Sequence, residues 1–138
     1  MIAYVDSSVL LRLVLRQPGA LKEWSSVEEG VTSALTQVEC LRTLDRLRVA
    51  ERIQDDALAS RREAIFGILA TLSVVDIASA ILDRAAQPLP TALGTLDAIH
   101  LATAQLWRER GASELTMATH DAALATAARS IGMPIVGV

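Results

Sequence analysis

Apolar residues change their spacing along this chain, and the changes divide it into strands and helices. The continuous apolar run Ile2–Val5 is typical of a buried strand, and from Ser8 the apolar residues follow a helical spacing. These helical positions are Val9, Leu10, Leu13 and Val14. The break "QPG" at 17–19 ends the helix. Asp6 therefore lies at the junction of a strand and a helix, which is a place for a helix cap or for chemistry.

The same alternation continues to the end of the chain. Further strands are predicted near 31–33, at 71–77, within "LTMAT" (115–119) and at 134–138, and helices at 35–51, 55–70, 78–86, 95–111 and from Asp121 to Gly132. The apolar stripe of the helix at 35–51 consists of Leu35, Val38, Leu41, Leu44 and Leu47. The prolines of "QPLPTALG" end the helix at 78–86, and Thr95 is predicted to cap the next helix.

Strands that alternate with helices, without any hairpin signal, indicate a parallel sheet with helices on both faces. The length of 138 residues fits one domain, spanning 1–138. Apolar residues make up 51% of the chain but aromatic residues only 3%, so the core must be built from Ala, Val, Leu and Ile. We therefore expect an α/β fold, in which ligands bind outside the carboxyl ends of the strands.

Composition narrows the classes of function. The net charge of −3 argues against non-specific electrostatic binding of nucleic acid, although it does not exclude a local basic face. Cys40 is the only cysteine, which favours a reducing, cytoplasmic compartment, and no basic leader precedes the first apolar run. The apolar stretch at 64–82 contains Asp76, and the cost of placing a carboxylate inside a bilayer argues against a membrane span and against a membrane partner.

Acids stand at two of the predicted strand ends, although each has a local explanation. Asp6 and Asp121 could each be a helix N-cap, and Ser7 or Ser8 could replace Asp6 in that role. Thr119 adds a second polar group at the strand end before Asp121. The capping explanation therefore accounts for Asp121 better than for Asp6.

Two more acids lie in the first turns of predicted helices. The helix dipole favours a negative charge at Asp97 by roughly 0.3–1 kcal/mol, yet Asp97 shares a face with Leu101 and Ala104 and so is expected to turn toward the sheet. Glu39 lies at the edge of the apolar stripe of its helix. The alternative for Glu39 is an exposed ion pair with Arg42.

A doubly wound sheet would gather these four acids at one edge. Gathered carboxylates repel each other, and without compensation at least one would keep its proton, with a raised pKa. A hard divalent cation removes that repulsion, and oxygen ligands without a His or Cys set point to Mg²⁺ or Mn²⁺ rather than zinc. Such a site can activate water and neutralise a phosphodiester under attack.

Four segments carry a resemblance to a known family: "YVDSSVLLRL", "TSALTQVECLRTL", "LGTLDAIHLATA" and "LTMATHDAALATAARSIGMPIVGV". In this order and spacing they resemble the PIN-domain ribonucleases, and specifically the VapC toxins of bacterial type II toxin–antitoxin pairs. The resemblance implies a three-layer sandwich with a mainly parallel central sheet flanked by helices. It also implies a Mg²⁺- or Mn²⁺-dependent endoribonuclease, a homodimer, and an antitoxin partner whose C-terminal tail covers the site.

The same resemblance implies roles for individual residues. Asp6 and Asp97 match the principal metal ligands of the family, and Glu39 and Asp121 complete its acidic quartet. Thr119 has a polar counterpart in the family and is expected to hold a metal-bound water.

Two features stay open at this level. His100 follows Asp97 by three positions and invites a role as general base, but packing against the next helix is the preferred interpretation. A set of arginines could face RNA, although solvated helix faces account for most of them: Arg42, Arg46, Arg48, Arg52, Arg61 and Arg62.

Other protein classes place acids at strand ends too. A phosphoacceptor receiver domain needs a lysine near the last strand, but the only lysine is Lys22. A phosphatase of the haloacid dehalogenase type needs Asp-x-Asp after the first strand, but Ser7 and Ser8 follow Asp6. A non-catalytic PIN-like module that binds protein or RNA remains the alternative, and its usual sign, a lost acid, is absent.

Overall fold

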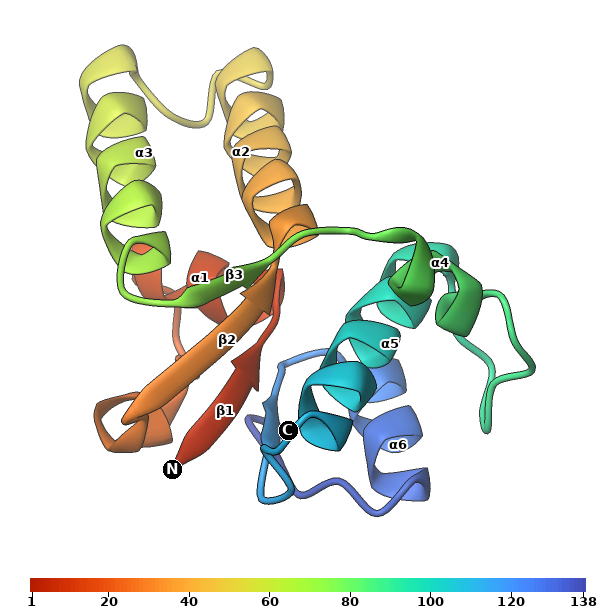
Figure 1. Cartoon of the computed structure of the whole chain (residues 1–138). Coiled ribbons are helices and arrows are strands. Elements are labelled where there is room, and N and C mark those ends of the chain that lie inside the picture. Colours follow the sequence, from red (N-terminus) through yellow and green to blue (C-terminus); the bar gives the residue numbers. More distant parts are fainter.

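The computed structural model, which describes residues 1–138, is built around a sheet of five strands (Figure 1). The strands are β1 (Ile2–Val5), β2 (Glu29–Ser33), β3 (Ser73–Val75), β4 (Thr116–Ala118) and β5 (Ile135–Val136), in the order β3-β2-β1-β4-β5. Every neighbouring pair is parallel, which confirms the predicted sheet. The chain runs outward from β1 to β3 and then returns to β4 on the other side of β1. This reversal of strand order marks the edge at which α/β folds bind ligands.

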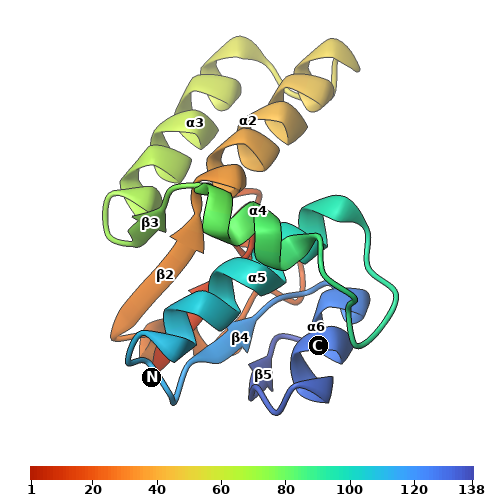
Figure 2. The same cartoon turned by 45° about the vertical axis from the view of Figure 1, so that its right-hand side comes forward.

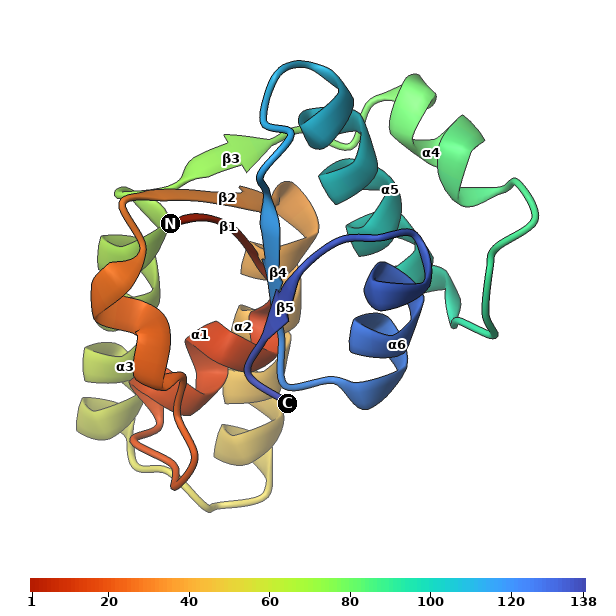
Figure 3. The same ribbon diagram turned by 90° about the horizontal axis from the view of Figure 1, so that it is seen from below.

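Helices cover both faces of the sheet (Figure 3). One face carries α1 (Ser7–Val14), a short 3₁₀ segment η1 (Lys22–Ser26), α2 (Ala34–Val49) and α3 (Asp55–Leu69). The other face carries α4 (Ser79–Ala85), α5 (Thr95–Glu109) and α6 (Ala122–Ser130). α4 packs on α5 (Figure 2), and α2 and α3 extend as a pair beyond the carboxyl ends of the strands (Figure 1). The predicted three-layer α/β sandwich is confirmed.

The central strand divides the core between these two layers. Ala3 and Val5 pack in one cluster with α1, α2 and α3, whereas Tyr4 packs in the other cluster with α5, α6 and β4. Successive side chains of a strand point to opposite faces, so the three buried residues of β1 supply both cores. The aliphatic residues of these clusters fit the low aromatic content of the chain.

The structure corrects three details of the sequence prediction. Thr95 does not cap α5: Gly94 holds the N-cap position, and no side chain bonds to the free N–H groups. Val38 is 56% exposed, and the buried residues of α2 are Thr36, Cys40 and Leu44. Periodicity predicts an apolar face but does not say which side of it the neighbouring helices α1 and α3 cover. The segment η1 was not predicted.

The remaining elements agree with the prediction to within a few residues, with β3 and β5 shorter than expected. Gly132 follows α6 with φ +72°, a left-handed conformation that suits the end of a helix. None of the helices combines the length and the hydropathy that crossing a bilayer would require.

Candidate active site

The four acids singled out in the sequence lie on elements that meet at the carboxyl edge of the sheet. Asp6 directly follows β1 and Asp121 follows β4, while Glu39 lies near the start of α2, which continues from β2. Asp97 lies in the first turn of α5. Burial raises the pKa of Asp97, and the negative charges of Asp121, Asp6 and Glu39 raise it further. All four acids therefore share one electrostatic environment, which we call the acid cluster.

Asp6 is held in place from both sides. Only 3% of the residue is exposed. Its Oδ1 accepts hydrogen bonds from the Ser8 hydroxyl (2.6 Å) and from the Val9 N–H (3.3 Å), and its Oδ2 accepts one from the Thr119 hydroxyl (2.6 Å). Burial raises the pKa of Asp6, and the bonds from Ser8 and Thr119 oppose that shift because they stabilise the carboxylate. Asp6 is thus both the N-cap of α1 and a member of the acid cluster.

The loops after β1 and β4 are tied together through the same hydroxyl groups. The Thr119 hydroxyl accepts a bond from the Asp121 N–H (2.9 Å), and the Ser8 hydroxyl accepts one from the His120 N–H (2.8 Å). Asp121 in turn caps α6 through Oδ1, which accepts from the Leu124 N–H (2.9 Å). These bonds fix the separation of the two strand ends that carry Asp6 and Asp121.

Glu39 is held by His100 rather than by an arginine. Nε2 of His100 lies 2.5 Å from Oε1 of Glu39, and Nδ1 lies 2.7 Å from the Tyr4 hydroxyl. The alternative pairing of Glu39 with Arg42 is wrong, because Arg42 pairs with Asp45 (3.0 Å).

This arrangement sets the tautomer of the imidazole. Burial raises the pKa of Tyr4 well above its usual value, so the phenol keeps its proton and can donate it to Nδ1 of His100. Nε2 then carries the ring proton and donates it to Glu39. His100 is packed, as predicted, with 1% of its surface exposed. Its contact with Glu39 was missed, although the spacing of His100 one turn after Asp97 was a signal for it.

Several carboxylate oxygens of the acid cluster make no hydrogen bond: both oxygens of Asp97, Oδ2 of Asp121 and Oε2 of Glu39. No group of three or more His, Cys, Asp or Glu side chains is arranged to hold a metal ion as it stands. The donor chemistry nevertheless fits a hard divalent cation, because the cluster offers only oxygen ligands and concentrates negative charge. The pKa of Asp97 supports this fit: burial is the main cause of its rise, and the charges of Asp121, Asp6 and Glu39 add a repulsion that a cation would remove.

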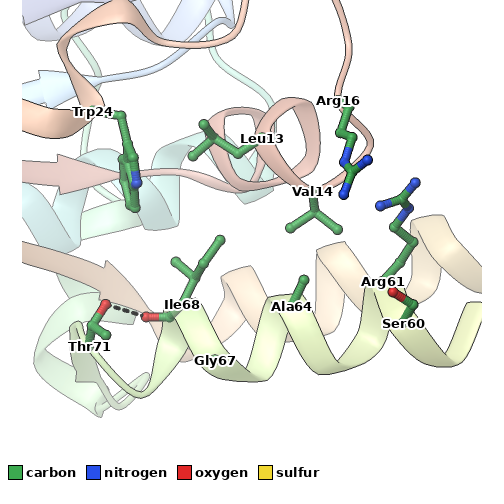
Figure 4. Close-up of a pocket in the computed structure, with 10 residues that line it drawn as sticks. All are labelled: Leu13, Val14, Arg16, Trp24, Ser60, Arg61, Ala64, Gly67, Ile68 and Thr71. Atoms are coloured by element: carbon green, nitrogen blue, oxygen red, sulfur yellow. Dashed lines mark hydrogen bonds between the residues drawn. The ribbon is translucent and has the colours of Figure 1, made fainter.

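A cavity of about 530 Å³ lies away from the acid cluster. Figure 4 shows its lining residues. This cavity lies between α1, η1 and α3, with Trp24 and Ile68 at one end and the guanidinium groups of Arg16 and Arg61 at the other. None of the four acids lines it.

Cys40 is buried, and burial raises the pKa of its thiol to about 12, so it packs rather than reacts.

Comparisons with known proteins show the family of the chain. The PIN domain family matches residues 3–130 of the chain. Ribonuclease VapC46 of Mycobacterium tuberculosis is 35% identical over 136 residues, which cover 96% of this chain and 95% of that protein. The chain belongs to the PIN-domain family, in its VapC-type branch.

Solved structures extend the agreement to the fold. FitAcB from Neisseria gonorrhoeae superimposes with a TM-score of 0.72 at 18% identity, over 98% of this chain and 96% of that one. A toxin–antitoxin complex from Klebsiella pneumoniae gives a TM-score of 0.63 at 22% identity, over 86% of each chain. At such low identity these two likenesses concern the fold alone.

Proposed function

We propose that this chain is a metal-dependent endoribonuclease that acts as the toxin of a type II toxin–antitoxin pair. The observation that carries the proposal is the acid cluster, in which the pKa of Asp97 is raised by burial and by the other three carboxylates. Membership of the PIN-domain family and 35% identity to a ribonuclease support it. The whole chain, 1–138, then forms one nuclease domain that works in the cytoplasm, where its RNA substrate is found.

In this proposal Asp6 and Asp97 are the principal ligands of Mg²⁺ or Mn²⁺, and Glu39 and Asp121 complete the site. When bound, the cation supplies charge neutralisation at the phosphodiester and activation of water. Ser8 and Thr119 orient the carboxylate of Asp6, and Thr119 remains a candidate for holding a water molecule in the site. His100 orients Glu39 through one oxygen and leaves the other free. Preoriented ligands reduce the reorganisation that binding requires.

The partners follow from the same assignment. We propose an antitoxin whose C-terminal tail covers the acid cluster, and a homodimer of this chain. The fold that this chain shares with a toxin–antitoxin complex is the support for an antitoxin partner in this proposal. Co-expression with the antitoxin should relieve growth arrest and block cleavage. An antitoxin that binds without inhibiting cleavage would contradict the tail mechanism.

The direct test is cleavage of an RNA oligonucleotide by the purified chain with Mg²⁺, with Mn²⁺ and with excess EDTA. We expect cleavage only with a metal, and products with a 5′-phosphate and a 3′-hydroxyl, which form when water attacks phosphorus and the 3′-oxygen leaves. Full activity in EDTA, or cyclic 2′,3′-phosphate ends, would show a metal-independent reaction. RNA binding without cleavage under every metal condition would favour the alternative, a non-catalytic PIN-like interaction module.

A further inference from the structure

A second cavity, of about 290 Å³, begins at the acid cluster and follows α2 away from it. At one end it is lined by Glu39 of the cluster and by Leu96, the residue before Asp97. At the other end it is lined by Arg42 and Arg46. The cavity therefore joins one carboxylate of the acid cluster, that of Glu39, to a pair of positive charges.

The spacing along α2 explains this arrangement. Residues three, four and seven positions apart share one face of a helix, so Glu39, Arg42 and Arg46 point to the same side. At 1.5 Å per residue, the two arginines lie about 4.5 Å and about 10.5 Å along the helix axis from Glu39. Positive charge thus begins one helical turn from the acid cluster and continues where α2 extends past the sheet (Figure 1).

Both arginines are available to an anion. Arg42 pairs with Asp45 at the surface, where its side chain is 62% exposed, and Asp45 also pairs with Arg48. Arg46 donates only to the hydroxyl of Thr43. Exposed ion pairs contribute little to stability, so exchanging such a contact for a phosphate costs little.

The rest of the cavity is aliphatic and open. Val38 is 56% exposed and Leu96 49% exposed, although both are apolar. No aromatic side chain lines the cavity, so a base or ribose would be held by aliphatic contact rather than by stacking. An RNA strand that is cleaved at the acid cluster must continue past it, and this cavity leads from Glu39 of the cluster to Arg42 and Arg46.

We propose that this cavity receives the nucleotide next to the cleaved phosphodiester of a single-stranded RNA, with Arg42 and Arg46 binding its phosphate. The proposal rests on the proposed function, because it takes the acid cluster as the place of cleavage. It also explains how a protein with a net charge of −3 binds a polyanion: two arginines supply positive charge locally, although the net charge of the protein is negative.

The test measures binding of a single-stranded RNA oligonucleotide in EDTA, over a series of salt concentrations, to the wild type and to two double variants. R42A/R46A removes the proposed contacts. R110A/R129A removes the same charge from two exposed arginines outside the cavity. The slope of log K against log salt changes by about 0.7 for each phosphate of a single strand that the protein neutralises, so the loss of this one phosphate contact in R42A/R46A should lower it by about 0.7. The control should keep the slope of the wild type, and R42K/R46K should restore it.

Kinetics and unfolding keep this proposal separate from the proposed function. With Mg²⁺, R42A/R46A should raise KM at least tenfold while kcat changes less, and its thermal stabilisation by Mg²⁺ should equal that of the wild type. Equal slopes for the two double variants would overturn the proposal while leaving metal-dependent cleavage intact. Weakened antitoxin binding with unchanged RNA binding would also overturn it, since the cavity would then dock a protein. If RNA binding depends on Arg42 and Arg46 but nothing is cleaved, the binding site stands and the nuclease function is wrong.

Discussion

Asp6 and Asp97 belong to the same acid cluster, but the protein holds them in different ways. Asp6 is nearly inaccessible and accepts three hydrogen bonds, from Ser8, Val9 and Thr119. Asp97 is partly exposed and accepts none. Burial is the main cause of a raised pKa at both residues, but hydrogen bonds oppose it at Asp6, whereas neighbouring carboxylates add to it at Asp97.

This difference separates two tasks within one site. A buried carboxylate whose oxygens accept hydrogen bonds is held in one position, because moving it would break those bonds without replacing them by bonds to water. A carboxylate that faces other negative charges is not electrostatically compensated, so it is able to bind a cation. Each of the following predictions tests one side of this comparison.

The largest effect should follow from neutralising Asp6. D6N keeps the shape of the side chain and can still cap α1, since Asn is a good N-cap. It removes the negative charge, so RNA cleavage should fall by at least about 10²-fold and growth arrest on expression should disappear while the protein still accumulates. Cleavage by D6N at the wild-type rate would show that Asp6 is only a cap.

Removing one support of Asp6 should have the next largest effect. T119V takes away the donor to Oδ2 and leaves the buried carboxylate less stabilised, so its pKa should rise further. Mg²⁺ affinity, measured by calorimetry, should fall about 10- to 100-fold, as for other groups that orient metal ligands. T126V is the matched control, because the Thr126 hydroxyl bonds only to a carbonyl of its own helix. Equal Mg²⁺ affinities in the two variants would contradict the supporting role.

His100 provides the corresponding support for Glu39. H100L removes the donor to Oε1 and should lower Mg²⁺ affinity and kcat/KM by about tenfold or more. H100Q places an amide N–H near the position of Nε2 and should recover most of that loss, although both variants give up the bond to Tyr4. If both variants lose the same amount, His100 contributes packing alone.

The smallest effect is expected for the stability of D97N in EDTA. The sign of this change in the free energy of unfolding distinguishes a shared site from a helix-dipole role. Because the folded-state pKa of Asp97 is raised, its ionisation costs folding free energy. That cost is fully present above the raised pKa and disappears as the pH falls below the unfolded value of about 3.9. D97N should therefore be at least as stable as the wild type at pH 7, and should lose this advantage at low pH.

Thermal unfolding gives the measurement and its control. D56N neutralises an acid in the first turn of α3, outside the cluster, and should lose roughly 0.3–1 kcal/mol of helix-dipole stabilisation. Added Mg²⁺ should stabilise the wild type by mass action and D97N much less. If D97N is destabilised like D56N and responds to Mg²⁺ like the wild type, Asp97 is a helix-dipole residue and the shared site is wrong.

Much of this architecture could be read from local pattern. The alternation of strands and helices predicted the parallel sheet, and the positions of Asp6 and Asp121 directly after strands placed them at its carboxyl edge. Both inferences work because strand direction and helix starts depend on residues close together in the sequence. The resemblance to a family then joined these two acids to Glu39 and Asp97.

Other features depended on which helix faces meet in three dimensions. The buried face of α2 is set by α1 and α3, so periodicity wrongly included Val38 in the core. The chain from Tyr4 through His100 to Glu39 joins side chains 61 and 96 positions apart. No local pattern can contain such a contact, because the rotation of α2 and α5 about their axes is fixed only when both pack against the sheet. The sequence by itself determined which acids stand at the edge, and the tertiary structure decided how each one is held.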